Sequence, residues 1–133
     1  MGKKCVISAV VMFVMAWALS FFVHGVLLHG DYVQMQSWMR PQADSFSLFP
    51  YMIGAQALFG VAFAWIYMQG RSDRPWLMQG VRYGVAIALL TMVPTYLIYH
   101  VVTPVPLFVA IKQIVLDSIR VVLMGVVLAW INR

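Results

Sequence analysis

The segment that decides the fold is VPLFVAIKQIVLDSIRVVLMGVVLAWI, which runs from Val105 to Ile131 near the carboxyl terminus. It is long enough to cross a bilayer, because about 20 helical residues at about 1.5 Å each span roughly 30 Å of hydrocarbon. Lys112, Asp117 and Arg120 interrupt this hydrophobic run. Charges at bilayer depth cost roughly 2.5 to 3.5 kcal/mol each, so we expect them to be paired, turned inward or functional.

The composition places the rest of the chain in the same environment. Of the 133 residues, 63% are hydrophobic and only 10% are charged, whereas about a quarter of the residues in a globular domain are charged. The net charge of +5 would suggest a nucleic-acid partner for a soluble protein. Here the basic residues flank hydrophobic runs, so we expect a lipid bilayer and no nucleic acid as the partner. Cys5 has no second cysteine with which to form an intrachain disulfide.

The hydrophobic runs predict an all-α membrane protein with one domain over residues 1–133 and four transmembrane helices. The predicted spans are residues 6–28, 51–69, 76–99 and 106–131. The first run lacks a small-residue cleavage site, so we expect a retained helix rather than a signal peptide. Short connections between the later spans favour an up-down antiparallel bundle. The long loop over residues 29–50 is apolar enough to lie on the membrane surface or against a partner.

The distribution of basic residues predicts the orientation of the chain in the membrane. One side of the predicted spans carries most of them, and the other side carries a single arginine near two acidic residues. The first group is Lys3, Lys4, Arg71, Arg74 and Arg133, and the second is Arg40 with Asp31 and Asp44. Because cytoplasmic loops carry the excess of lysine and arginine, both termini are expected in the cytoplasm.

Small residues at four-residue spacing predict where the helices touch. Without a hydrophobic force between helices in lipid, small side chains favour association because they let backbones approach closely. The residues are Gly60 and Ala64 on the second span and Gly80, Gly84 and Ala88 on the third. Pro94 is expected to kink the third span, because it removes a backbone donor and clashes with the preceding turn.

On the fourth span, Gln113, Asp117 and Arg120 recur at steps of four and three, which places them on one helical face. Asp117 and Arg120 are therefore predicted to form an ion pair. The pair could lock this helix against a neighbour, form an assembly face for another chain, or belong to a proton or ion pathway. Lys112 lies about 140° around the helix from Asp117 and is expected to extend its amine toward the membrane boundary.

The histidines form a second candidate site nearer the outer surface. His24 and His29 lie about 140° apart on a helix, so a shared ligand would require His24 with His100. Asp31 is the expected hydrogen-bond partner of His24. These three residues could hold a haem or a divalent metal, and Tyr96 or Tyr99 could donate to a quinone. Histidine is ordinary at a membrane interface and a structural role is the favoured interpretation, so no cofactor is favoured, and the site is expected to be separate from Asp117.

Four strings of sequence carry a resemblance to known proteins. They are FFVHGVLLHGDY (residues 21–32), SWMRP (37–41), QALFGVAFAWIY (56–67) and PVPL (104–107). In this layout the chain resembles a set of small bacterial membrane proteins with four predicted helices. The resemblance implies a multi-pass protein of the bacterial inner membrane and supplies no activity or catalytic residues.

No nucleophile and base pair, phosphate loop or recognised metal spacing is present, so we expect no enzyme. The leading hypothesis is a non-catalytic accessory or structural subunit that packs against other membrane chains or a second copy of itself. One alternative is a haem, metal or quinone site using His24, Asp31 and His100. The other is a small transporter or proton pathway using Asp117 and Arg120.

Overall fold

The computed structural model describes residues 2–133, and this range is helical without any strand. Four helical segments are long and apolar enough to cross a membrane, which makes the chain a multi-pass membrane protein. They are Lys3–Leu27, Phe49–Gln69, Trp76–Val102 and Leu107–Ile131. Each end lies within three residues of its predicted boundary.

Two of these segments contain a π-helical turn. The first consists of α1 (Lys3–Phe21) followed by the π turn η1 (Phe22–Leu27). The third consists of α5 (Trp76–Ile87), the π turn η3 (Ala88–Met92) and α6 (Val93–Val102). Such turns are rare and are frequently found at functional sites.

The π turn η3 has a clear sequence cause in Pro94, which lies two residues after its end. Proline lacks the amide hydrogen that would close an α-helical turn, and its ring clashes with the carbonyl four residues earlier. The Thr91 hydroxyl donates a 2.7 Å hydrogen bond to the carbonyl oxygen of Ile87. The expected irregularity before Pro94 is therefore present and takes the form of a wider turn.

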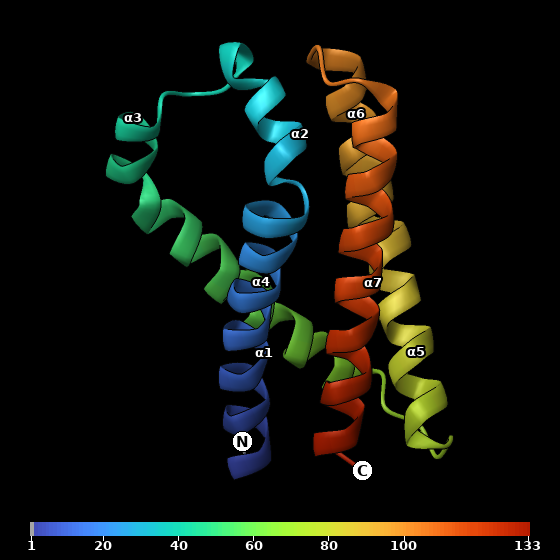
Figure 1. Cartoon of the computed structure of the whole chain (residues 1–133). Helices are drawn as coiled ribbons and strands as arrows, with labels where there is room; N and C mark the ends of the chain where they lie inside the picture. Colours follow the sequence, from blue (N-terminus) through green and yellow to red (C-terminus); the bar gives the residue numbers. More distant parts are fainter. Residues whose placement is uncertain (1) are drawn as a thin grey trace.

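The segment 29–50 differs from its prediction as a loop. It contains the short helices α2 (His29–Gln34), η2 (Gln36–Trp38) and α3 (Gln42–Ser47). Figure 1 shows that α2 continues upward from η1 in nearly the same direction as α1. Helical structure thus extends past the end of the hydrophobic run and carries the polar residues of α2 alongside the beginning of α7 (Leu107–Ile131).

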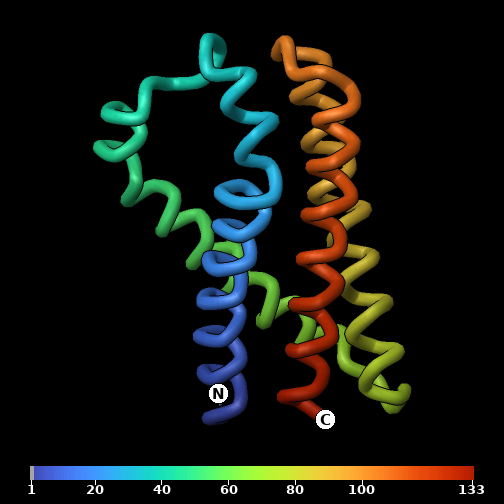
Figure 2. Tube along the Cα trace, in the orientation of Figure 1, coloured from blue at the N-terminus to red at the C-terminus, as the bar shows by residue number. Residues whose placement is uncertain are grey.

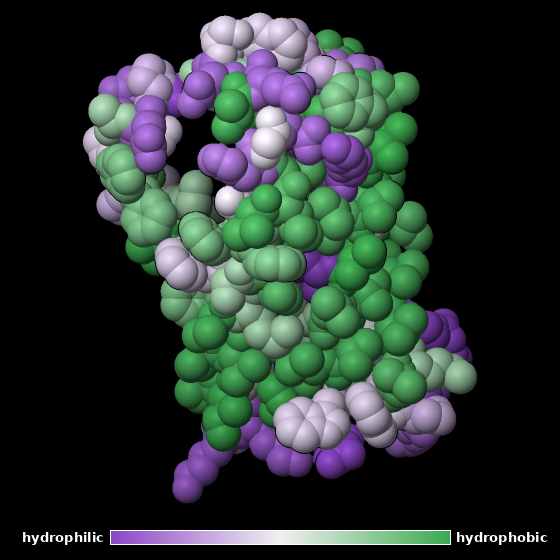
Figure 3. Space-filling model, in the orientation of Figure 1, coloured by the Kyte–Doolittle hydropathy of each residue, from purple (hydrophilic) through white to green (hydrophobic). Residues whose placement is uncertain are grey.

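The helices do not all run side by side. α1, the α5–α6 segment and α7 run alongside one another, while α4 (Phe49–Gln69) is steeply inclined and crosses α1 (Figures 1 and 2). Both termini lie at one end of the molecule with residues 70–75, which we call the terminal end. The segment 29–50 and residues 103–106 lie at the opposite end, the loop end. Hydrophobic residues form a broad band between these more hydrophilic ends (Figure 3).

The first segment lies antiparallel along α7, and polar contacts mark the register from one end to the other. In order from the loop end, the contacts pair Asp31 with Lys112, His24 with Asp117, Ala16 with Arg120, and Ser8 with Asn132. The residue numbers fall along one segment as they rise along the other. This register fixes which side chains of the two segments can meet.

The predicted helix contacts are present as very close backbone approaches. A Cβ atom added to Gly84 would lie 2.5 Å from Val122 Cα, and one added to Gly60 would lie 2.5 Å from the Phe13 nitrogen. Gly80 meets α7 at Gly125, which the sequence pattern had not singled out, with 2.7 Å between the added Cβ and the Gly125 oxygen. Ala64 and Ala88 are buried as well. Glycine is therefore required sterically where α5 crosses α7 and where α4 crosses α1.

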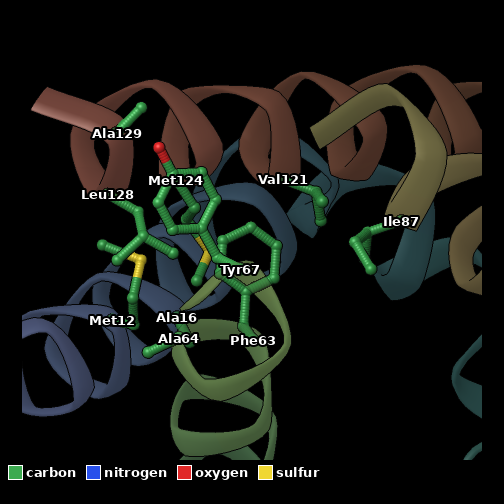
Figure 4. Close-up of a cluster of buried hydrophobic side chains, with 10 residues drawn as sticks. All are labelled: Met12, Ala16, Phe63, Ala64, Tyr67, Ile87, Val121, Met124, Leu128 and Ala129. Carbon is green, nitrogen blue, oxygen red and sulfur yellow. The ribbon is translucent and has the colours of Figure 1, made fainter. Parts of the chain in front are cut away.

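The hydrophobic core lies toward the terminal end from Arg120 and joins α1, α4, α5 and α7. Figure 4 shows side chains from these helices interdigitating in one cluster. Its buried members are Met12, Ala16, Phe63, Ala64, Tyr67, Ile87, Val121, Met124, Leu128 and Ala129. A second group of buried side chains, which are polar and charged, lies on the loop-end side of this cluster.

Candidate functional site

The Asp117 carboxylate is the centre of this polar and charged group, and its side chain is only 1% exposed. Its Oδ2 atom lies 3.0 Å from His24 Nε2 and also accepts a hydrogen bond from the Tyr96 hydroxyl. Its Oδ1 atom lies 3.0 Å from Arg120 Nε. A buried carboxylate is costly unless it is paired and hydrogen-bonded, and Asp117 has both kinds of partner. We call these side chains, with Tyr32 and Gln113 described below, the Asp117 network.

Arg120 forms the predicted ion pair with Asp117 and lies with it inside the protein. Its side chain is 7% exposed, and its other nitrogens reach the carbonyl oxygen of Ala16 at 3.3 Å and the sulfur of Met92 at 4.0 Å. The guanidinium also lies over the Phe59 ring, 5.8 Å from its centre. The pair therefore joins α7 to α1, α4 and η3 of the same chain. It does not face outward as an assembly surface for another protein, which corrects that alternative.

His24 connects the carboxylate to α2. Its Nδ1 atom lies 2.5 Å from the Tyr32 hydroxyl, and the two rings are stacked with 6° between their planes. Gln113 Nε2 donates a 3.1 Å hydrogen bond to the same hydroxyl. Since Tyr32 accepts from Gln113, it is free to donate to Nδ1, which leaves Nε2–H to donate to Asp117. A neutral His24 in this tautomer satisfies every one of these hydrogen bonds.

Burial and neighbouring charge keep the Tyr32 phenol protonated. Desolvation raises its pKa above the ordinary value of 10.0, and the nearby carboxylates Asp117 and Asp31 add to the increase. The hydrogen bond from Gln113 acts in the opposite direction without reversing the shift. Tyr32 is therefore a fixed hydrogen-bond donor at neutral pH.

Asp31 and Lys112 form a separate ion pair closer to the loop end. Lys112 Nζ lies 3.0 and 3.1 Å from the two Asp31 oxygens and 5.4 Å from the centre of the Phe108 ring. The Lys112 side chain is half-exposed, in keeping with its expected position near the membrane boundary. This pair ties α2 to α7 next to Tyr32 and Gln113, at the loop-end edge of the Asp117 network. Asp31 is therefore committed to Lys112 and is not the carboxylate that His24 contacts.

An apolar pocket of about 440 Å³ adjoins the network at the loop end. Three of its wall residues, His24, Tyr32 and Gln113, belong to the network. The remaining walls are Met35, Trp38, Met39, Tyr99, Thr103, Pro104 and Val105. His24 is 29% exposed, so the network meets open space on this side. Toward the terminal end it meets the hydrophobic core instead.

The structure does not bring together the three residues predicted as a metal site. His24 contacts Asp117, Asp31 contacts Lys112, and His100 Nδ1 lies 2.6 Å from the carbonyl oxygen of Val105 in the turn before α7. No group of three or more histidine, cysteine, aspartate or glutamate side chains suited to a metal occurs within residues 2–133. His29 lies elsewhere, beside a second loop-end pocket. The expected metal site is therefore not formed in this structure, because each of the three predicted ligands makes a different contact.

The separation expected between His24 and Asp117 was also wrong, and its cause is α2. Because helical structure continues beyond Leu28 as α2, His24 lies within the first helical rod rather than at its tip. The network also includes Tyr32, which sequence reasoning did not single out. The useful signal was that it lies eight residues from His24, two helical turns along.

Comparisons with protein-family models, with curated proteins and with solved structures found no match for this chain. Its chemistry is therefore inferred from the geometry of the site.

Proposed function

We propose that this chain is a non-enzymatic membrane protein that binds a small amphipathic molecule in the loop-end pocket. The main support is that the pocket and the buried network share three residues, which are His24, Tyr32 and Gln113. A ligand there would meet apolar side chains along its body and oriented polar groups at one end. Binding sites for small molecules commonly combine these two features.

The free hydrogen-bonding groups favour a neutral ligand with carbonyl or hydroxyl groups. Gln113 uses one N–H for Tyr32, and its carbonyl oxygen and second N–H have no partner among residues 2–133. The oxygen accepts from a hydroxyl, and the N–H donates to a carbonyl. The Asp117 carboxylate and the Arg120 guanidinium cancel in charge, and the pocket lining contains no lysine, arginine, aspartate or glutamate. A quinone or its hydroquinone form fits these requirements, whereas an ion does not.

The proposed location is the bacterial inner membrane, with both termini in the cytoplasm and the pocket opening at the outer surface. Basic residues near the terminal end support this orientation. Arg133 lies within cation–π distance of Trp76 and Trp130 there, 5.9 and 5.4 Å from the ring centres. Tryptophan and arginine commonly anchor a helix end at a membrane surface.

The two other functions expected from sequence have less support. A subunit role rested in part on an ionic face available to another chain, and Asp117 and Arg120 are buried within this chain. A transmembrane proton pathway would have to continue from Arg120 toward the terminal end, where the side chains of Val121, Met124 and Leu128 are buried in the apolar core. Both remain predictions, and ligand binding is the function that the arrangement favours.

Quenching of tryptophan fluorescence tests the proposal, because Trp38 lines the pocket. The protein would be placed in nanodiscs and titrated with a short-chain ubiquinone analogue. We expect saturable quenching, and Gln113→Leu should weaken binding about tenfold, the effect of losing one buried hydrogen bond. Gln56→Leu is the matched control, since Gln56 donates to Ser20 Oγ at 3.1 Å and does not line this pocket. It should bind as the unmodified protein does.

Two results would overturn the proposal. One is quenching by the analogue that never saturates, which would indicate partition into lipid rather than a site. The other is an equal loss of binding in Gln113→Leu and Gln56→Leu, which would indicate a general effect on folding.

A further inference from the structure

A second pocket at the terminal end is lined by charged residues that the Asp117 network does not use. It has a volume of about 370 Å³ and lies where the end of α4 meets the connection at residues 70–75 and the first turns of α5. Arg74 and Arg82 line it together with Ser72, Gln79, Tyr67 and Tyr83. It shares no residue with the loop-end pocket.

The walls of this pocket are held in place by their own hydrogen bonds. Gln79 Nε2 donates to the carbonyl oxygens of Ser72 at 2.7 Å and Arg74 at 2.6 Å. Gln79 Oε1 accepts from the Ser72 amide at 3.2 Å. On the facing side, the Tyr83 hydroxyl donates to the carbonyl oxygen of Phe63 at 2.5 Å. The connection is therefore clamped to α5, and the backbone that carries Arg74 is fixed before any ligand arrives.

The side chains of the two arginines are not held by contacts of this kind. Neither the Arg74 nor the Arg82 side chain has a hydrogen-bond or ion-pair partner among residues 2–133. Asp73 is the nearest acidic residue in sequence, but it lines a neighbouring pocket and not this one. The cavity thus presents two unpaired guanidinium groups. A guanidinium group matches the oxygens of a phosphate with two parallel hydrogen bonds.

The position of Arg82 points to a ligand that comes from the membrane. It lies six residues after Trp76, which is about 9 Å along a helix, inside a segment able to span the bilayer. Its neighbours Val81 and Val85 are exposed hydrophobic residues that would face lipid. An unpaired charge in that setting is costly, and a lipid phosphate at the boundary would supply the missing partner.

We propose that Arg74 and Arg82 bind the phosphate of an anionic phospholipid, with the head group in the terminal-end pocket and the acyl chains along α5. Basic pockets between transmembrane helices are a recurring type of site for such head groups. A free phosphate ion has the same oxygens but would gain nothing from the exposed apolar surface of α5. This site is independent of the proposed ligand at the loop end.

Native mass spectrometry of the full chain in detergent tests the assignment. Phosphatidylglycerol should bind in a saturable way, and phosphatidylcholine, whose head group has no net charge, should bind about tenfold more weakly. Inorganic phosphate alone should not compete. Arg82→Gln and Arg74→Gln should each reduce phosphatidylglycerol affinity about tenfold. Arg82→Lys, which keeps the charge without the planar fork, should fall between, and it also serves if Arg82→Gln does not fold.

The matched control is the double variant Lys3→Gln with Lys4→Gln, which removes two charges near the same end without touching the pocket. It should retain the affinity for phosphatidylglycerol. An equal loss in this control would overturn the proposal in favour of a general surface charge effect. Competition by inorganic phosphate at similar concentration would overturn it in favour of a soluble anion.

Discussion

The terminal half and the loop half of the molecule hold their helices together in different ways. In the terminal half, Gly80 and Gly84 of α5 lie so close to α7 that any side chain would strike its backbone. In the loop half, α6, α2 and α7 meet through tyrosine, histidine and carboxylate groups. The first arrangement gains from close van der Waals contact, which is the main attraction between helices in lipid. The second leaves a pocket beside polar groups. Close packing is therefore found in the terminal half, and the proposed binding site lies in the loop half.

The largest effect should come from Gly84→Leu in the terminal half. The atoms that a new Cβ would strike belong to the backbone of Val121 and Val122, so no side-chain rotation relieves the clash. We expect the free energy of unfolding to fall by about 4 kcal/mol or more, which exceeds the usual cost of overpacking. Little folded protein should remain in detergent. Thermal unfolding followed by circular dichroism measures it.

Gly54→Leu is the control for this variant, because a Cβ at Gly54 meets nothing within 4 Å. It should fold as stably as the unmodified chain or slightly better, since leucine favours a helix more than glycine does. If Gly84→Leu unfolds no more easily than Gly54→Leu, the close contact between α5 and α7 is wrong.

In the loop half, Asp117→Ala should have the next largest effect. It leaves the Arg120 guanidinium buried without its carboxylate and removes the acceptor for His24 and Tyr96. Loss of one partner from a buried pair typically costs about 3 to 5 kcal/mol. Asp44→Ala, which removes an exposed carboxylate on α3, should change the free energy of unfolding by less than about 0.5 kcal/mol. Similar unfolding curves for both variants would contradict the buried network.

A smaller, pH-dependent effect is expected at Tyr32. Its pKa is raised in the folded chain, so the unfolded chain loses this proton first as the pH increases. The contribution of Tyr32 to stability is complete below about pH 10 and is lost as the pH rises through its higher folded pKa. Melting temperatures of the unmodified chain and Tyr32→Phe should therefore converge above pH 10. A difference that stays constant from pH 8 to 11 would argue against burial of this phenol.

The smallest effect should follow Lys112→Gln. The Lys112 side chain is half-exposed in its ion pair with Asp31, and pairs near the surface contribute about 0 to 1 kcal/mol. We expect a small drop in melting temperature that disappears in high salt, because mobile ions already screen the pair. A drop as large as that of Asp117→Ala would mean that the two ion pairs form one cooperative unit.

Much of the terminal half could be predicted from sequence because its signals are local. Hydrophobic runs marked the four spans, and the spacing of Gly80, Gly84 and Ala88 marked the face of α5 that meets α7. The Asp117 and Arg120 pair was predictable for the same reason, since residues three apart on a helix are neighbours. Gly125 and Ala129 are small residues four positions apart on α7, so a signal of the same kind was present there and was missed.

The loop half could not be predicted in the same way, because its contacts join residues far apart in sequence. His24 and Asp117 are 93 positions apart, and their meeting depends on where the first helical rod ends. A hydrophobicity pattern ends that rod near Leu28, whereas the polar helix α2 extends it. The depth of every residue in this region follows from that extension.

The π turn η1 has a consequence for how this protein can tolerate insertions and deletions. A π turn accommodates one residue more than an α-helical turn of the same rise, so deletion of Gly25 would allow Phe22–Leu27 to close as ordinary α-helix. Residues beyond the turn would then keep their rotation about the helix axis, because the π turn had already absorbed the extra residue without a change of rise. Deletion of Ala18 from the regular helix α1 would instead rotate Asp31 and Tyr32 by about 100° relative to the residues before it and take them away from their partners. The π turn η1 is therefore the place where this segment can change in length and still present the site.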